Sequence, residues 1–208
     1  MYPLVKRLTD CLVALVALVF LGPVMAIIAI AIWCTMGKPV LFRQVRPGYL
    51  ERPFVCLKFR TMTEERDREG RLLLDGQRLT RLGLLLRRTS LDELPQFWNV
   101  LRGDLSVVGP RPLYTEYLPY YTAEEHLRHS VPPGLTGWAQ IHGRNYLSFD
   151  DRLVMDVWYA RHRSWRLDLK IILKTVYIVL TQQGIADDPR APYAPLHEQR
   201  ARLTGGLR

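Results

Sequence analysis

Two adjacent carboxylates stand within the stretch "RRTSLDELPQFWN", which spans residues 87–99. Ser90 and Glu93 have the spacing of a capping box, in which two side chains satisfy backbone N–H groups of a helix's first turn. Asp92 and Glu93 would also lie at a helix N-terminus beside Arg87, where a carboxylate stays ionised. An ionised carboxylate can act as a nucleophile or as a magnesium ligand. From these residues alone, both a structural role and a chemical role remain open.

Two stretches rich in glycine and proline follow, and both contain residues suited to binding phosphate or nucleotide. In "GPRPL", Arg111 stands between two prolines. It is either a solvated arginine in a rigid turn or a guanidinium held still for bidentate phosphate contact. Residues 132–145, "PPGLTGWAQIHGRN", form either an irregular loop or a nucleotide-binding loop. In the second case, Gln140, Arg144 and Asn145 are the candidate nucleotide-binding residues.

The composition describes a folded, basic chain. It has 208 residues, of which 48% are hydrophobic, so it is long enough and apolar enough to bury a core. The formal net charge of +9 suggests an anionic partner, which could be nucleic acid, acidic lipid head groups or a phosphate-bearing substrate. The three cysteines lack the spacing of a metal site, and we interpret them as reduced thiols on the cytoplasmic side.

Residues 11–36 contain no charged side chain and are a candidate membrane segment. Gly22-Pro23 stands at the centre, where proline kinks or breaks a helix. Each half is then roughly 18–21 Å long, too short for a hydrocarbon core of about 30 Å. Basic residues flank the run on both sides: Lys6, Arg7, Lys38, Arg43, Arg46 and Arg52. These features favour a helix-break-helix that enters one leaflet and returns, although a kinked spanning helix is an equally open alternative.

The elements that would position these residues follow from the pattern of the remaining chain. Alternation predicts short strands at 39–46 and 52–62, joined by a turn at Pro47-Gly48. Helices are expected at 79–88, 90–102, 148–163 and 166–184, and Gly/Pro-rich loops at 106–113 and 131–145. Asp156 and Asp168 lie on these helices and are expected to be ion-pair partners.

The expected fold class is a small, mostly helical, membrane-associated α/β domain with a short sheet. We expect residues 1–37 to form a re-entrant membrane segment broken at Gly22-Pro23, residues 38–186 a cytoplasmic catalytic domain, and residues 187–208 a C-terminal tail.

Four stretches together resemble a known family: "KRLTD", "KFRTM", "RRTSLDELPQFWNVLRGDLSVVGPRP" and "PGLTGWAQIHGRN". Their order and spacing resemble those of the bacterial sugar transferases, the small monotopic phosphoglycosyl transferases. The resemblance extends from about Lys6 to about Thr181. It implies a re-entrant membrane helix. One departure is visible, because the break in better-known members is often Ser-Pro, whereas here it is Gly22-Pro23.

The resemblance implies a reaction and a role for each matched residue. Members transfer sugar 1-phosphate from a nucleotide sugar, usually a UDP-sugar, to polyprenyl (undecaprenyl) phosphate, and release UMP. By motif position, Asp92 resembles the nucleophile of a ping-pong mechanism with a covalent phosphosugar intermediate. Glu93 resembles the ligand of a Mg²⁺ cofactor. Arg87 and Arg111 match arginines that hold phosphates.

The same resemblance implies a monotopic protein on the cytoplasmic face of the bacterial inner membrane, with membrane lipids as partners and a homodimer as one conceivable assembly. The alternative is a membrane-anchored basic binding module, for example one for nucleic acid. That alternative does not account for adjacent carboxylates between arginines, so we expect no nucleic-acid partner. No residue identifies the sugar or the glycan pathway.

Overall fold

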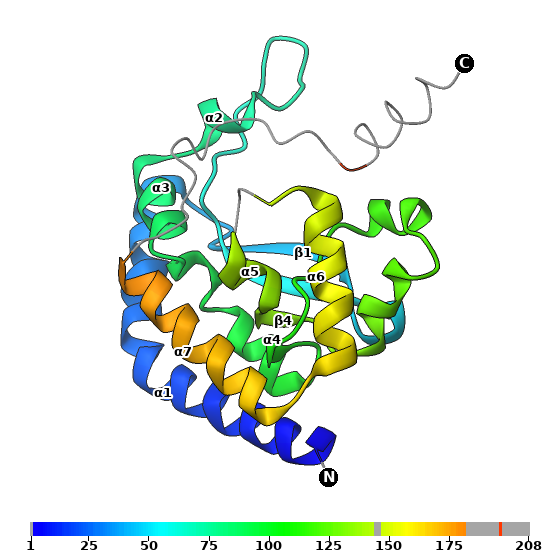
Figure 1. Cartoon of the computed structure of the whole chain (residues 1–208). Helices are drawn as coiled ribbons and strands as arrows, with labels where there is room; N and C mark the ends of the chain where they lie inside the picture. The colour runs from blue at the N-terminus through cyan, green and yellow to red at the C-terminus, as the bar shows by residue number, and fades with distance from the viewer. Residues whose placement is uncertain (1, 144–146, 182–195, 197–208) are drawn as a thin grey trace, which may run out of the picture.

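The apolar N-terminal segment forms one continuous helix, α1 (Tyr2–Met36), in the computed structural model, which describes residues 2–143, 147–181 and 196. Gly22 and Pro23 lie inside this helix, so the predicted interruption into two helices is wrong. Pro23 has no N–H to donate to the carbonyl of Val19, and the helix accommodates the loss without ending. Figure 1 shows α1 bending along one side of the domain.

The N-terminal part of α1 is fixed to the domain by polar contacts. Arg7 donates hydrogen bonds to the carbonyl oxygens of Val100 (2.6 Å) and Leu101 (2.8 Å) in α4 (Gln96–Arg102). Asp10 is 6% exposed and accepts a hydrogen bond from the backbone N–H of Val107 at 3.1 Å. These contacts satisfy carbonyl groups near the end of α4 and tie three distant segments together.

The C-terminal part of α1 is fixed to the same domain by apolar packing. Ile28 and Ile32 are buried against Phe59, Leu86 and Leu94. Both ends of the helix are thus held by the same domain. The outward residues of α1 are apolar and exposed: Leu4, Val5, Leu8, Leu12, Leu15, Val16, Val19, Phe20, Val24, Ile27, Ile30 and Trp33.

This exposed apolar face indicates that the protein associates with a membrane. Within the described residues, α1 is the one helix long and apolar enough to cross a bilayer, judged by length and composition. An exposed patch of this kind is unfavourable in water, and contact with lipid removes the cost.

The two predicted strands are confirmed as an antiparallel pair, β1 (Leu41–Pro47) and β2 (Pro53–Phe59). The predicted turn is also present, with the 3-10 helix η1 (Tyr49–Glu51) after Gly48. The register places Arg46 opposite Phe54 and Gln44 opposite Cys56. Opposed residues share a face of the sheet, so Arg46, Cys56 and Lys58 lie on one side of the hairpin.

The two Gly/Pro-rich stretches contain a second, parallel pair of strands that was not predicted. β3 (Ser106–Val108) pairs with β4 (Gly134–Thr136). Helix α5 (Trp138–His142) follows within the second stretch. The prediction of irregular loops is therefore wrong for these residues.

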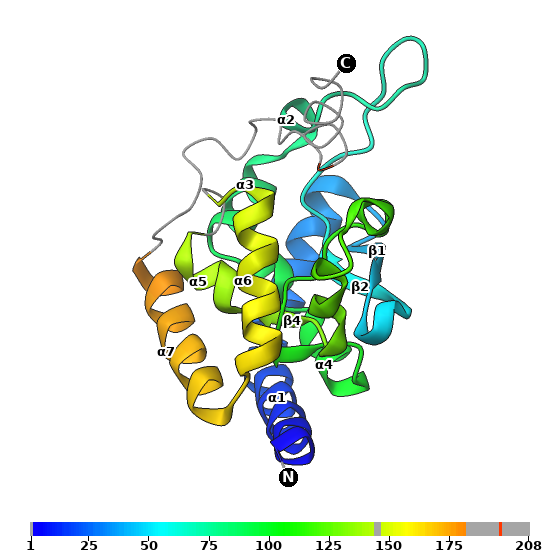
Figure 2. The same ribbon diagram turned by 45° about the vertical axis from the view of Figure 1, so that its right-hand side comes forward.

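Helices are confirmed at the four predicted places, and they pack around the strands (Figures 1 and 2). Their bounds are α3 (Arg81–Arg88), α4 (Gln96–Arg102), α6 (Phe149–His162) and α7 (Trp165–Thr181). The helix predicted at 90–102 is divided, because the 3-10 helix η2 (Leu91–Glu93) precedes α4. The short helix α2 (Asp75–Arg78) and the 3-10 helices η3 (Thr115–Tyr120) and η4 (Glu125–Ser130) were not predicted. The main core contains Ala14, Phe54, Cys56, Val100, Leu105, Val107, Val108, Val131, Ile141, Tyr159, Ile171 and Ile178. It joins α1, both strand pairs, α4, α6 and α7 into one unit.

Candidate active site

The two adjacent carboxylates lie in η2, a short turn between α3 and α4. Ser90 precedes this turn in the left-handed conformation (φ 57°) and makes no side-chain capping hydrogen bond. The capping box suggested by the sequence is therefore absent. Pro95 is the N-cap residue of α4, and Gly103 ends that helix with φ 93°, as predicted. The chain between Ser90 and Pro95 is thus a tight turn that presents Asp92 and Glu93.

Glu93 is held between two cations. Its Oε1 lies 2.6 Å from Nζ of Lys58 and 2.6 Å from an η-nitrogen of Arg111. Burial alone would raise the pKa of Glu93, but the two positive charges and their hydrogen bonds outweigh it and hold that pKa well below its usual range. Glu93 is therefore a permanent anion, and its position is fixed by residues from β2 and from the turn after β3.

Asp92 is in a different environment, although it is the next residue. It is 8% exposed, and burial raises its pKa to about 6, with the negative charge of Glu93 adding to the effect. Lys58, Arg111 and Arg87 act in the opposite direction. The sequence predicted that the helix N-terminus and basic neighbours would keep this carboxylate ionised, and it did not anticipate the burial that raises its pKa. At pH 7 Asp92 is still mostly ionised.

The turn that carries Arg111 is fixed by the parallel strand pair. The backbone N–H of Gly109 donates to the carbonyl of Thr136 at 2.8 Å, and that of Gly134 donates to the carbonyl of Pro110 at 2.9 Å. A Cβ on Gly134 would lie 2.1 Å from the backbone nitrogen of Gly109, so only glycine allows this approach.

A buried ion pair supports the same turn from behind. Arg128, which is 2% exposed, donates to the carbonyl oxygen of Arg111 at 2.7 Å and pairs with Asp156 at 2.6 Å. This confirms the prediction that Asp156 is an ion-pair partner. Asp168 also pairs with a basic residue, Lys6 of α1, at 2.6 Å. Removing one member of a buried pair is costly, so the Arg128–Asp156 pair holds the Arg111 turn in place.

Of the other predicted phosphate- and nucleotide-binding residues, the structure describes Arg87 and Gln140. Arg87 donates from Nε to Oγ1 of Thr61 at 3.0 Å, and it is close enough for its charge to act on Asp92. Gln140 lies in α5, with its side-chain amide buried and without a hydrogen-bond partner in the described chain. Arg144 and Asn145 lie outside the described residues.

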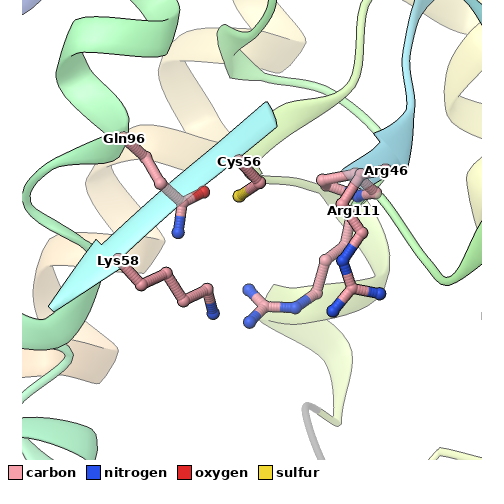
Figure 3. A pocket seen from close by; sticks show the side chains of 6 residues that line it. Arg46, Cys56, Lys58, Gln96 and Arg111 are labelled. Atoms are coloured by element: carbon pink, nitrogen blue, oxygen red, sulfur yellow. The ribbon is translucent and has the colours of Figure 1, made fainter. Parts of the chain in front are cut away.

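A pocket adjoins the carboxylates on the side of the β1–β2 hairpin. Its lining residues are Arg46, Cys56, Lys58, Gln96, Arg111 and Pro112. Figure 3 shows Lys58, Gln96 and Arg111 pointing into a shared space, with the sulfur of Cys56 at its inner end. Sequence reasoning did not select Arg46, Lys58 or Gln96. The alternation of β2, which sets Cys56 and Lys58 on one face, was the signal that could have located Lys58.

The site lies against the apolar N-terminal helix. Leu94 belongs to the same buried cluster as Ile28 and Ile32 of α1, and Leu91 packs against that cluster. The residues on either side of Asp92 and Glu93 are therefore in contact with the C-terminal half of α1.

The donor set fits a magnesium ion that shares its coordination with a substrate. Magnesium in phosphate-transfer sites is bound by one or two carboxylates, with waters and phosphate oxygens completing the shell. Asp92 and Glu93 supply two adjacent carboxylates, and Glu93 is ionised at any physiological pH. Among the described residues, no group of three or more potential ligands forms a metal site independent of substrate.

The site thus contains two adjacent carboxylates, one fixed between cations and the other with a pKa raised to about 6. Residues 1–182 match the family model described as bacterial sugar transferase. The chain therefore belongs to the bacterial sugar transferase family, as the sequence motifs indicated, and it is an enzyme, a transferase.

Curated relatives agree with this assignment. The chain is 50% identical over 182 residues to the uncharacterized sugar transferase EpsL of Bacillus subtilis, covering 88% of this chain and 90% of that protein. It is 43% identical over 182 residues to the UDP-glucose:undecaprenyl-phosphate glucose-1-phosphate transferase of Klebsiella pneumoniae, covering 83% of this chain but only 39% of that protein. It is 38% identical over 198 residues to the exopolysaccharide production protein ExoY of Sinorhizobium fredii, covering 86% and 87%.

Proposed function

We propose that the protein transfers a sugar 1-phosphate from a UDP-sugar to polyprenyl phosphate and releases UMP. The observation that carries this proposal is the pair Asp92–Glu93, in which Lys58 and Arg111 neutralise one carboxylate and leave the other available. The names of two relatives, which specify UDP-glucose and undecaprenyl phosphate, support the substrate classes. The chain spans 39% and 40% of the length of those two relatives, so their substrates are carried over as part of the proposal.

In the first half-reaction, an Oδ atom of Asp92 attacks the sugar-proximal phosphorus. A bond forms between that oxygen and phosphorus, and the bond to the bridging oxygen breaks, with its electron pair leaving on UMP. Asp92 then carries the phosphosugar as an acyl phosphate. No proton transfer is needed, because the nucleophile is already ionised at pH 7.

In the second half-reaction, an oxygen of the polyprenyl phosphate attacks the same phosphorus. The bond to Asp92 breaks, its electron pair returns to the carboxylate, and the lipid carries the sugar as a diphosphate. The two half-reactions give ping-pong kinetics. They also allow one site to serve a water-soluble donor and a membrane-bound acceptor in turn.

The charges of the site suit an attack of an anion on an anion. Lys58, Arg87 and Arg111 act on the two carboxylates, and Arg46 lines the adjoining pocket. These four positive charges exceed the two carboxylates by two. The diphosphate of a UDP-sugar carries about two negative charges, which this excess would neutralise. Bidentate arginine contacts would fix the phosphates for in-line displacement. Glu93 would hold the magnesium ion, which supplies further neutralisation of phosphate charge when bound.

We also propose that α1 is re-entrant, meaning that it dips into one leaflet and does not cross the bilayer. Contacts of Arg7 and Asp10 at one end, and of Ile28 and Ile32 at the other, hold both ends to the same domain. A spanning orientation would pull that polar domain into the hydrocarbon layer. The enzyme would then be monotopic, on the cytoplasmic face of the inner membrane.

The proposed activity is tested by adding the purified protein to a panel of UDP-sugars with magnesium and undecaprenyl phosphate, and measuring UMP. We expect release with at least one sugar, and none after Asp92→Asn. Absence of release with every sugar would refute the transferase proposal. For topology, single cysteines placed beyond each end of α1 should both react with a reagent supplied from the cytoplasmic side. Labelling from opposite sides would show a spanning helix.

A further inference from the structure

Two hydrogen-bond donors face the pocket without an anionic partner. Gln96 is 3% exposed, and its Nε2 is buried with no hydrogen-bond partner among the described residues. Figure 3 shows this amide directed into the pocket beside Lys58. A buried donor left unpaired is costly, so a side chain in this state is expected to have an acceptor in some step of the protein's work.

Arg46 is the second such donor. Its guanidinium is oriented by Gln44, whose Oε1 lies 2.6 Å from Nη2, and it stacks over the ring of Tyr114 at 3.8 Å. Within the part of the chain that the structure describes, no carboxylate lies within ion-pair distance of Arg46. This differs from Lys58 and Arg111, which line the same pocket but share the single negative charge of Glu93.

The remaining lining of the pocket is electrically neutral. Cys56 is buried, which raises the pKa of its thiol above the ordinary value and keeps it protonated. Pro112 offers no side-chain donor or acceptor. The pocket therefore combines an unpaired amide donor, an uncompensated guanidinium and two shared cations, which is the complement of an oxyanion with several acceptor oxygens.

We propose that this pocket, defined by Arg46, Cys56 and Gln96, is a phosphomonoester subsite used in both half-reactions. It would hold the phosphate of UMP as it leaves and the phosphate of the acceptor lipid as it arrives. This inference rests on the proposed function. It goes further by assigning one position, formed by Arg46 and Gln96, to the leaving group and to the incoming nucleophile.

The chemistry of displacement at phosphorus links the two ligands. In the first step the leaving oxygen of UMP departs from the side opposite the Asp92 oxygen, and in the second step the lipid oxygen enters from that same side. UMP and the lipid phosphate are both phosphate monoesters, with the same three terminal oxygens. Lys58 and Arg111 act on Asp92 through their charges and also line the pocket, so the pocket lies near the carboxylate that would attack the phosphorus.

The proposal is tested by binding measurements on full-length protein that carries Asp92→Asn, so that neither ligand reacts. UMP and a short-chain polyprenyl phosphate are titrated separately by calorimetry. Gln96→Leu keeps the volume but removes the donor, and should weaken both ligands by roughly ten- to hundredfold, as expected for a lost hydrogen bond to a charged group. Gln77→Leu, on the surface of α2, is the matched control and should change neither.

A second variant distinguishes a loss of binding from a loss of folding. Gln96→Glu keeps the shape but adds a negative charge, and it should weaken both ligands at least as strongly as Gln96→Leu while the melting temperature stays close to that of the parent. Parallel weakening of UMP and lipid supports the shared subsite. If either ligand binds both Gln96 variants as tightly as it binds the parent, the proposal is overturned. UMP release by the otherwise unmodified chain is measured alongside, so failure of the transferase proposal is recognised separately.

Discussion

The unequal environments of the two carboxylates predict an unusual pH dependence for the first half-reaction. Burial and the neighbouring Glu93 raise the pKa of Asp92 to about 6 from an ordinary 3.8. The reaction should slow as the pH falls, because a raised pKa means that the protonated, non-nucleophilic acid predominates below about pH 6. The apparent kcat/KM for the UDP-sugar should therefore fall about tenfold for each pH unit below 6.

The pH below which kcat/KM falls is called the acid limb here. Removing the negative charge of Glu93 and removing the positive charge of Lys58 should shift this acid limb in opposite directions. Glu93→Gln removes a negative charge and frees Lys58 and Arg111 to act on Asp92, so the pKa of Asp92 should fall by about one unit or more. Lys58→Met removes a positive charge and should raise it by a similar amount. One unit corresponds to about 1.4 kcal/mol of differential interaction. Both variants are expected to be slower than the unmodified enzyme. The quantity to compare is therefore the pH of the acid limb and not the absolute rate.

The assay is single-turnover UMP formation with enzyme in excess and without acceptor lipid. Omitting the lipid matters because a phosphate monoester has its own second pKa near 6, whereas the diphosphate of a UDP-sugar has no such ionisation. If kcat/KM of the unmodified enzyme falls only near pH 4, the nucleophile has an ordinary carboxylate pKa. That result would contradict the assignment of a buried nucleophile. A limb that moves the same way in Glu93→Gln and Lys58→Met would refute the electrostatic explanation.

Three further predictions concern the framework of the site. Asp10→Ala leaves the buried N–H of Val107 without its acceptor and removes one hydrogen bond of Ser106, whose hydroxyl can still donate to the carbonyl of Val108. It should lower stability by about 2 kcal/mol, or roughly 4–8 °C in melting temperature, whereas Thr9→Ala, at the exposed neighbouring position, should have little effect in a thermal melt. Gly134→Ala forces a Cβ against the backbone of Gly109 and should reduce UMP release more than tenfold, with a lowered melting temperature. Arg111→Lys keeps the charge but loses the bidentate fork, and should raise the KM for UDP-sugar at least tenfold while the melting temperature changes little.

Elements with a strong local pattern were predictable from the sequence. The alternation of Val and Phe located β1 and β2, and leucine spacing located α3. The parallel pair β3–β4 was not predictable, because each strand has three residues and the pairing depends on close contact between Gly109 and Gly134, which are distant in sequence. The break at Gly22-Pro23 was predicted from the rule for proline. Contacts at both ends of α1 outweigh that rule.

The candidate site was predictable in its residue types and not in its electrostatics. Adjacent carboxylates and a proline-flanked arginine identified Asp92, Glu93 and Arg111, and the structure brings Glu93 and Arg111 into contact. No local pattern could show that Asp92 is buried, and burial is what raises its pKa. Lys58 was overlooked because its partner Glu93 lies 35 positions away and pairs with it only through the fold.

The central claim is that Asp92 carries the phosphosugar, and the most direct measurement is mass spectrometry of the protein after incubation with magnesium and a reactive UDP-sugar, without acceptor lipid. We predict an increase in intact mass equal to one sugar phosphate, which maps to the peptide containing Asp92 and disappears when polyprenyl phosphate is added. Asp92→Asn should show no adduct and no UMP. An adduct on any other residue, or full turnover by Asp92→Asn, would contradict the account.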